Sequence, residues 1–503
     1  MSEDAEIKRL IEPGLQFRYG QAMADPRDGL SLFGPPDTEL SSHPRNITYG
    51  VIGTTEGIKA FAAFSDALTK PQFITPEPKN RRLWLIYPGF EAAFHCTWPK
   101  TPAASHLIDS EGLSKLSRHK EPNQRAFDVV NVYLDGIKTL KKRDEAFNVF
   151  ICVVPDEVWL NCRSQSHVSD GVGVNITAKE RQHRIKGQMH FFDDYNPDQY
   201  RLSTDFRRQI KARAMEYDVP IQIVRESTLT LTKEDKSPSR GLTPLSDRAW
   251  NLSTALYYKA GGKPWKLTTA REGVSYVGLA FRRADPKLTS STAVCAAQMF
   301  IDSGDGIVFL GEYGQWWSSE NKQFHLTGSA AKNLLAGVIG TYKELDGRPL
   351  KEIFLHSRSD ISREEFEGYK KACPEGVKLV GIRVKTDRFG LRLYREGTRP
   401  VLRGTFLKLN QRTGFLWAAG FKPELGTYDG WEVPAPLRLD IQHGEGDIEQ
   451  IASDIMSLTK LNYNACKLGS SQPVTVGFSD AVGEILVSNP DIKHRRPQFK
   501  FYI

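Results

Sequence analysis

The 503-residue chain lacks any apolar run of about 18 residues, the length needed to cross a bilayer as a helix. Its first residues, MSEDAEIKRLIEPG, lack the apolar core of a secretory signal. It has only six cysteines, and no two of them form a CxxC pair. These absences argue against a membrane protein, a disulfide scaffold and a structural zinc site, and we expect a cytoplasmic protein.

Internal repeats, coiled-coil heptads and a low-complexity tail are also absent, and no GxGxxG sequence follows an apolar run. The chain therefore offers no dinucleotide chemistry of its own. Its hydrophobic content of 40% and charged content of 25% are typical of a globular protein with a large core. The length predicts two or three domains. The formal net charge of +8 favours a polyanionic partner.

In the first half of the chain, apolar runs alternate with segments whose apolar residues recur at helical spacing. The segment Asp25 to Asp37, DPRDGLSLFGPPD, is rich in turn formers, and we expect little regular structure in residues 1–45. The run ITYGVIG precedes helical spacing in Glu56 to Leu68. Phe147 to Pro155 is almost wholly apolar, as in a parallel strand covered on both faces. A helix over Asp205–Tyr217 and a strand over Pro220–Val224 continue an open α/β sheet.

The second half begins with three apolar runs that predict neighbouring strands joined by short turns. These runs are Val274–Arg282, Ala293–Ile301 and Gly306–Tyr313. A helix over Ala330–Lys343, a buried strand over Glu352–His356 and a helix from Ser362 should follow. This order predicts a mixed sheet covered by helices.

Two segments bring together residues suited to a terminal phosphate. In Asn251–Leu267, NLSTALYYKAGGKPWKL, the glycines after Lys259 end a helix and allow close approach of the backbone. Arg207 and Lys211 lie four residues apart on one helix face, and Gln222 follows. Three cations and an amide can hold a phosphate monoester. The alternative is an ordinary solvated helix face with a glycine C-cap.

A basic ribbon follows, which we expect to be a loop from Gly381 to Arg403. Its cations, interleaved with Phe389 and Tyr394, are Arg383, Lys385, Arg388, Arg392, Arg395, Arg399 and Arg403. They form either a solvated surface or, with Lys263, the wall of a nucleic-acid channel. The C-terminal segment KHRRPQFKFYI is also basic, and its apolar close predicts a docked end.

Ordered motifs over nearly the whole chain resemble a short prokaryotic Argonaute, which has MID and PIWI domains and no PAZ domain. One part of the match is the set of Arg207, Lys211, Gln222 and Lys259, which we call the phosphate-binding set. The motifs are GLSLFGP (29–35), VIGTTEGIKAF (51–61), YPGFEAAF (87–94), VVPDE (153–157), KAGGKPWKL (259–267), LTKLNYNA (458–465) and PVTVGFSD (473–480). The resemblance implies a linker-like segment at 1–45, a Rossmann-like MID domain at 46–255 and an RNase H-like PIWI domain at 256–503.

The resemblance also implies a role for the phosphate-binding set. In that family the MID pocket grips the 5′-phosphate of a short guide, and the matching positions here are Arg207, Lys211, Gln222 and Lys259. Arg207 stands where many members have an aromatic that stacks on the first base, and Ala255 stands where many have a second lysine. The family's terminal carboxylate, here on Ile503, helps to hold Mg²⁺ beside the phosphate.

The nuclease motifs depart from the slicing members of the family, which need clustered carboxylates to hold two metals. Ala280 replaces the aspartate of a YxGxD pattern, and Arg358 replaces the acid of an HRD-like motif. Asp480 matches the last acidic position, but one carboxylate cannot hold two metals. We therefore expect cleavage to be lost. The alternative is an active guided endonuclease that uses other acids, with candidates Asp302, Asp305, Glu312 and Asp360.

For function, the resemblance implies a guided sensor of invading DNA. A 5′-phosphorylated short guide RNA would pair with single-stranded target DNA, so that base pairing carries the specificity. The expected partner is an APAZ-domain protein with a TIR or Sir2 effector, whose NAD hydrolysis would be switched on by target binding, with a higher oligomer possible on activation. If the ordered motifs were coincidence, the chain would be a basic α/β protein with no guide.

Overall fold

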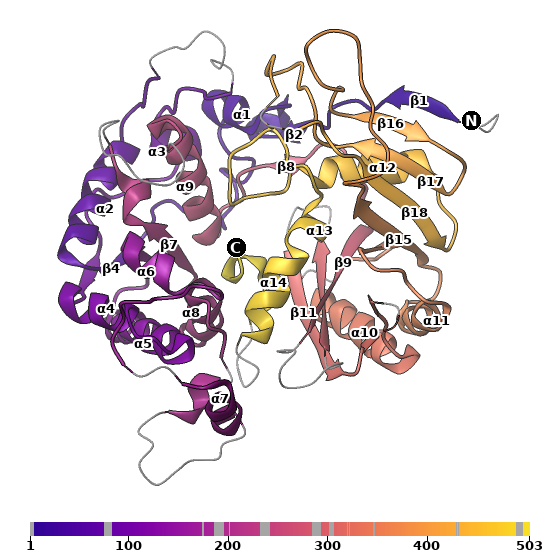
Figure 1. The fold of residues 1–503 in the computed structure, drawn as a ribbon. Helices are drawn as coiled ribbons and strands as arrows, with labels where there is room; N and C mark the ends of the chain where they lie inside the picture. The colour runs from indigo at the N-terminus through magenta and orange to yellow at the C-terminus, as the bar shows by residue number, and fades with distance from the viewer. Residues whose placement is uncertain are drawn as a thin grey trace.

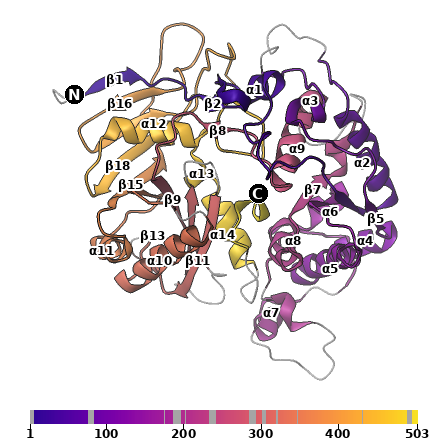
Figure 2. The same ribbon diagram turned by 180° about the vertical axis from the view of Figure 1, so that it is seen from behind.

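We describe a computed structural model of the chain, shown in Figure 1. Residues described are 5–74, 83–173, 176–185, 196–200, 202–231, 242–283, 293–300, 306–318, 320, 322–345, 348–428, 430, 432–488 and 496–503. Two lobes lie side by side, and the C-terminus lies between them in both views (Figures 1 and 2). We call residues 46–260 the first lobe and residues 261–503 the second lobe.

The first lobe is built on a four-stranded parallel sheet in the order β5-β4-β6-β7. The strands are β4 (Tyr49–Gly53), β5 (Ala104–Leu107), β6 (Val149–Val154) and β7 (Ile221–Arg225). Every residue of β6 is buried, as the apolar run predicted. Its side chains alternate between two cores, with Val149, Ile151 and Val153 on one face and Phe150, Cys152 and Val154 on the other.

Helices cover both faces of this sheet, which makes the first lobe Rossmann-like. Helix α2 (Thr55–Leu68) begins at Thr54, whose hydroxyl accepts from Gly57 N, and packs on one face. Helix α5 (Pro122–Lys141) packs on the other. The remaining helices are α3 (Phe90–Phe94), α4 (Ser110–Ser117), α6 (Asp156–Asn161), α7 (Ala178–Ile185), η2 (Pro197–Tyr200), α8 (Phe206–Ala214), η3 (Met215–Tyr217), η4 (Glu226–Leu229) and α9 (Leu245–Lys259).

The second lobe is built on a nine-stranded mixed sheet in the order β1-β16-β17-β18-β15-β14-β9-β10-β11. The three predicted neighbours are β9 (Val274–Arg283), β10 (Ala293–Phe300) and β11 (Gly306–Gly314), an antiparallel meander. Strand β14 (Glu352–Ser357) runs parallel to β9 and to β15 (Lys378–Thr386). The sheet continues through β18 (Leu437–His443), β17 (Thr413–Trp417) and β16 (Thr405–Lys408). This arrangement is RNase H-like, as expected.

Two layers of helices enclose this sheet. Helices α10 (Gly328–Leu345) and α11 (Arg363–Ala372) pack together on one face (Figure 2). A capping box at Ser362 starts α11. The other face carries α12 (Ile448–Leu458), α13 (Val474–Gly477) and α14 (Ser479–Val487). The short pair β12 (Trp317–Ser318) and β13 (Gln323–Phe324) lies outside the main sheet.

The first 45 residues differ from the linker-like segment that was expected. Strand β1 (Glu6–Arg9) adds to the edge of the large sheet by pairing with β16. The pair β2 (Leu15–Gln16) and β3 (Ala22–Met23) joins β8 (Lys266–Leu267), and η1 (Arg18–Gly20) lies between β2 and β3. The expectation of little regular structure at 25–37 was wrong, because α1 (Pro26–Leu32) forms there. The Asp25 side chain caps it and Pro26 occupies its first turn.

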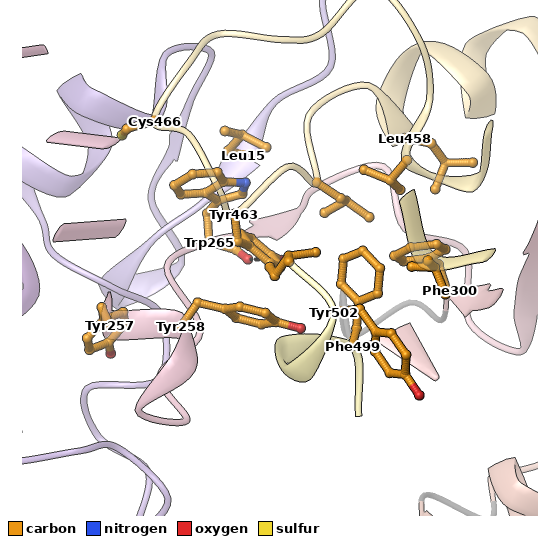
Figure 3. Close-up of a cluster of buried hydrophobic side chains, with 14 of the residues drawn as sticks. Leu15, Tyr257, Tyr258, Trp265, Phe300, Leu458, Tyr463, Cys466, Phe499 and Tyr502 are labelled. Carbon is orange, nitrogen blue, oxygen red and sulfur yellow. Dashed lines mark hydrogen bonds between the residues drawn. The ribbon is translucent and has the colours of Figure 1, made fainter. Parts of the chain in front are cut away.

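One hydrophobic core joins the two lobes. Figure 3 shows Tyr258 of α9 beside Tyr463, with ring centroids 4.7 Å apart, near the C-terminal Phe499 and Tyr502. Trp265 Nε1 donates to Lys460 O at 2.9 Å, and the Tyr463 hydroxyl donates to Trp265 O at 3.0 Å. The last short helix is η5 (Phe499–Phe501). Because this core is shared, groups from both lobes are held in fixed positions at the junction.

Among the described helices, none is long and apolar enough to span a bilayer.

Candidate nucleic-acid interface

Helix α8 positions the first of the predicted phosphate ligands. The Asp205 carboxylate caps it by accepting from Arg208 N, which fixes the register of the helix. Arg207 is exposed, whereas Lys211 is only 5% exposed. Lys211 Nζ donates a hydrogen bond to the Tyr502 backbone carbonyl at 3.1 Å. A cation on the first lobe thus meets the C-terminal segment.

Helix α9 ends at the second predicted lysine. Lys259 is 1% exposed, and its Nζ donates to Gln222 Oε1 in β7 at 2.7 Å. After it the chain turns sharply through Gly261, whose φ is +103°, a conformation that favours glycine. A side chain at Gly262 would collide with the Tyr257 ring. The glycines therefore make the tight helix end that brings Lys259 to Gln222.

The charges of these residues affect one another's protonation, which shows that the residues lie close together in one site. Burial, reinforced by the positive charge of Arg207, lowers the pKa of Lys259 to about 7. Burial also holds the pKa of Lys211 well below its ordinary range, and the charges of Lys259 and Arg207 add to this effect. Buried like charges weaken one another's charged forms, and an anion placed among them would restore both. Arg207, Lys211, Gln222 and Lys259 are thus brought together, and their arrangement suits an anion.

The loop after α9 is fixed by a buried carboxylate that the sequence did not single out. Asp37, 1% exposed, accepts from the Tyr257 hydroxyl at 2.6 Å and from Lys263 N at 2.7 Å. His43 Nδ1 lies 2.9 Å from the same hydroxyl. These bonds hold Lys263, a predicted channel residue, by its backbone. No local pattern reveals this network, because Asp37 and Tyr257 are 220 residues apart.

The C-terminal residues dock between the lobes, as predicted for the part that is described. Ile503 is 3% exposed, and the Tyr502 hydroxyl donates to Arg496 O at 2.8 Å. Because Tyr502 O accepts from Lys211, the terminal carboxylate of Ile503 follows directly after a group of the candidate pocket. Carboxylate and phosphate oxygens are the donors that Mg²⁺ prefers, so the chemistry of the available groups is compatible with this ion.

Ala280 and Arg358, the residues expected to replace two nuclease carboxylates, lie on the face of the large sheet that α13 and α14 cover. Gly278 pairs with His356, so Arg358 comes level with Ala280 on the neighbouring strand. Ala280 is buried and faces α14, where Gly483 approaches it closely. Arg358 Nη2 donates to Gln472 Oε1 at 3.1 Å and to Val476 O at 3.0 Å. The guanidinium of Arg358, the residue expected to replace the second acid, is therefore held against α13.

A buried histidine supports this arrangement. His356 Nδ1 lies 2.9 Å from Thr475 Oγ1 in α13, and burial lowers the pKa of His356 to about 3. The ring is therefore neutral near neutral pH. Asp480 lies in α14, but its side chain is outside the described residues, as are Asp302, Asp305 and the side chain of Glu312. Asp360 accepts from Gln442 and from Arg383.

The basic ribbon is not one loop, which corrects the expectation. Arg383 and Lys385 lie in β15, and Arg383 forms ion pairs with Asp360 and Asp440. Arg403 is buried, and its Nε lies 2.8 Å from Glu12 Oε2. Arg383 and Arg403 therefore stabilise the fold through carboxylates. The signal that was missed is the alternation of apolar residues in KLVGIRVKT, which is typical of a strand.

Other cations of the ribbon remain at the surface. Arg388 and Lys385 are exposed, whereas Arg392 is half-buried against its own loop. Arg399 lies over the Phe421 ring with 4.5 Å to the centroid. Of the residues predicted to line the channel, Lys385 and Arg388 are therefore the more accessible, whereas Arg392 is held by its own loop.

Comparison with solved structures identifies the fold as Argonaute-like. Clostridium butyricum Argonaute, bound to a guide DNA with a 5′ deoxycytidine and a 19-mer target DNA, matches with a TM-score of 0.63 and 15% identity, over 100% of this chain and 55% of that one. Aa-Ago with externally bound siRNA matches with a TM-score of 0.56 and 14% identity, over 99% and 56%. A. aeolicus Argonaute matches with a TM-score of 0.55 and 15% identity, over 96% and 54%.

The chain therefore spans about half the length of these structures, and the part it matches has their MID–PIWI fold. No protein-family model and no curated protein matches the sequence.

Proposed function

We propose that the chain binds the 5′-phosphate of a short guide strand between its lobes and pairs that guide with a target strand. One observation carries the proposal. Lys259 Nζ meets Gln222 at 2.7 Å and Lys211 Nζ meets the Tyr502 carbonyl at 3.1 Å, although Tyr502 is 291 residues from Lys211. An Argonaute structure with a similar fold is bound to a guide and a target DNA, which agrees with this role.

The pocket would act through charge. Burial and the positive charge of Arg207 disfavour the charged forms of Lys211 and Lys259 when no anion is present. A terminal phosphate carries about −1.5 to −2 charges, more than a phosphodiester, so it would restore the protonated lysines and be selected over an internal phosphate. Gln222 would orient Lys259. The backbone and bases beyond the first nucleotide remain free for pairing with the target.

Magnesium would fit beside this pocket. The Ile503 carboxylate and the guide phosphate oxygens are hard donors that would hold Mg²⁺, and the ion supplies further charge neutralisation when bound. This chain's own contribution is to bury its last residues so that the carboxylate stays next to Lys211.

We further propose that the protein does not cut its target. Ala280 supplies no ligand for a metal, and Arg358 places positive charge where a two-metal centre needs negative charge. An arginine there suits contact with a phosphate of the bound strand. The alternative, an active guided endonuclease that uses other acids, gains no support from Asp360, which is engaged by Arg383 and Gln442.

The biological role we propose is that of a sensor in prokaryotic defence. A short guide RNA would recognise single-stranded DNA of a plasmid or other invader in the cytoplasm. Binding would activate an associated APAZ-domain protein whose TIR or Sir2 effector hydrolyses NAD, with assembly into a higher oligomer. The ordered sequence motifs carry this part of the proposal.

Purification of the tagged protein from its native host would test the proposal. We expect short nucleic acids with 5′-phosphates, mostly RNA, to copurify together with an effector protein. Replacement of Lys211 and Lys259 by glutamate should remove the nucleic acid. Retention of the same nucleic acid by this variant would contradict the pocket, and a protein free of short nucleic acids would contradict the guide.

A further inference from the structure

A tight turn follows β15 and is closed by its own side chains. The Asp387 carboxylate accepts from Gly390 N at 2.9 Å and from Leu391 N at 3.0 Å. Arg392 Nη1 donates to Asp387 O at 3.0 Å and to Leu391 O at 2.9 Å. A Cβ at Gly390 would lie 2.3 Å from Asp387 Oδ2, so the turn needs glycine at that position. These bonds preorganise the turn.

The chain beyond the turn is anchored to the second lobe. Leu393 packs against the cluster of Val401, Phe415 and Trp417. Arg399 Nη1 donates to Gly426 O at 2.6 Å, and its guanidinium lies over the Phe421 ring. The turn is therefore held at both of its ends, and its tip has a defined position on the surface.

This fixed turn presents an aromatic ring to solvent. Phe389 is 99% exposed, and Tyr394 is 73% exposed a few residues later. Lys385 and Arg388 are exposed and precede Phe389 in the chain. Exposure of a phenyl ring to water is unfavourable, and a flexible loop could fold such a ring back onto the protein. A structured turn that keeps the ring outward, directly after two exposed cations, has the composition of a stacking platform for single-stranded nucleic acid.

The turn begins at the edge of the sheet that holds Arg358. Strands β14 and β15 are parallel, with Ser357 opposite Arg383, so Arg358 and the end of β15 lie at the same edge. A chain of hydrogen bonds joins them, since Gln472 accepts from Arg358 and donates from Nε2 to Thr386 Oγ1 at 2.9 Å. A nucleic-acid strand bound at the edge of the sheet where Arg358 lies would continue from there to the turn.

We propose that Phe389 and Tyr394 form a stacking site for an unpaired base of single-stranded nucleic acid, with Lys385 and Arg388 contacting the adjacent phosphates. The flanking cations favour a polyanion over an apolar protein surface. This inference rests on the proposed binding of nucleic acid. It adds a second site, separate from the 5′-phosphate pocket, that recognises a base and needs no terminal phosphate.

The test compares Phe389→Ala with Phe73→Ala, a matched control that removes a phenyl ring 77% exposed in the first lobe. The probe is a single-stranded oligonucleotide with a 5′-hydroxyl and one 2-aminopurine, whose fluorescence is quenched by stacking. We expect wild type and Phe73→Ala to quench it at defined positions. Phe389→Ala should lose the quenching and bind about tenfold more weakly, whereas Phe389→Tyr should retain both.

The outcomes separate this site from the pocket. Unchanged quenching and affinity in Phe389→Ala would overturn the stacking site, even if the protein still prefers 5′-phosphorylated strands. A Phe389→Ala variant that loses binding to the effector subunit and keeps its affinity for the oligonucleotide would also overturn it, in favour of a protein contact. Loss of the 5′-phosphate preference in pocket variants that still quench the probe would leave the stacking site supported.

Discussion

Lys259 Nζ lies 2.7 Å from Gln222 Oε1, so the end of α9 is joined to a strand 37 residues earlier in the chain. Both groups are turned into a site where Lys211 is also buried. Water does not solvate these amines well, and the positive charges oppose one another.

Affinity for a 5′-phosphate should fall as the pH rises above about 7. Lys259 has a pKa of about 7 in the empty protein, so binding of the phosphate would require uptake of a proton above that pH. The loss should approach tenfold per pH unit for each proton taken up. The measurement is the Kd of a 5′-phosphorylated oligonucleotide from about pH 6.5 to about pH 9, where the phosphate stays mostly dianionic. Calorimetry in buffers of different ionisation enthalpy would count the protons.

Lys259→Arg is the control, because arginine stays protonated over this range. We expect a shallower dependence on pH, with Lys211 responsible for what remains. The stability of the empty protein should change with pH in the opposite direction to its affinity for phosphate. Its folded state binds fewer protons than its unfolded state between pH 7 and 10.5, so the free energy of unfolding should rise across that window. A flat affinity profile in the wild type would contradict the buried charged pocket.

Extension of the C-terminus should weaken guide binding. Ile503 is buried and Tyr502 O accepts from Lys211, so added residues would have to leave through the junction of the lobes. We expect a short C-terminal tag to lower the affinity for a 5′-phosphorylated guide by at least about tenfold, the loss of roughly one charge-assisted contact. The matched control is the same tag at the N-terminus, which lies at the outer edge of the second lobe (Figure 1). Equal affinities of the two tagged proteins would be evidence against a role for the terminus.

The N-terminal segment should stabilise the second lobe through a buried ion network. Glu12 Oε1 lies 2.8 Å from Lys460 Nζ, and Glu12 Oε2 lies 2.8 Å from Arg403 Nε. Burial alone would raise the pKa of Glu12, but Arg403 and Lys460 outweigh it and hold that pKa below the ordinary value of 4.5. Glu12→Gln leaves two buried cations without their anion, and we expect it to lower the free energy of unfolding by about 3–5 kcal/mol.

Chemical denaturation measures this change. The control is Glu449→Gln, which removes a carboxylate that pairs with Lys8 and Lys408 at the surface and should have a much smaller effect. The stabilisation by Glu12 should be fully present above about pH 4.5 and should be lost as the pH falls through its lowered folded pKa. Equal effects of the two substitutions would show that the network does not stabilise the fold.

Target cleavage should be undetectable. With guide, matched target and Mg²⁺ or Mn²⁺, we expect the target strand to remain intact in a gel assay, because Ala280 and Arg358 cannot hold metals. Asp480→Ala should bind target as the wild type does. A cut at a single position, abolished by Asp480→Ala, would establish the endonuclease alternative.

Much of the fold could be predicted because its core strands are locally encoded. VFICVV is wholly apolar and became the central strand β6, and the glycines after Lys259 marked the end of α9. The helix at Pro26 was also readable, since aspartate followed by proline is a favoured start, but the turn-forming composition around it hid this signal. Strand β1 could not be predicted, because its partner in β16 is about 400 residues away and only pairing stabilises it.

The candidate site was predictable only in its residue types. Lys211, Gln222 and Lys259 were found from their spacing and the resemblance, and they do converge. Lys211 donates to the backbone carbonyl of Tyr502, 291 residues away. A pattern of side chains in the sequence cannot predict a contact with a backbone carbonyl. Arg383 was assigned to the channel by its charge, but Asp360 and Asp440 pair with it. Charge in a sequence does not show which cations the fold neutralises.

The most direct measurement of the central claim is the preference for a 5′-phosphate over a 5′-hydroxyl. Two oligonucleotides of one sequence, differing only at that end, would be titrated against the wild type and against Lys211→Met with Lys259→Met. We predict that the wild type binds the phosphorylated strand about ten- to a hundredfold more tightly per lysine contact, and that the double variant binds both strands equally while remaining folded. Equal binding of the two strands by the wild type, or an unchanged preference in the double variant, would contradict the account.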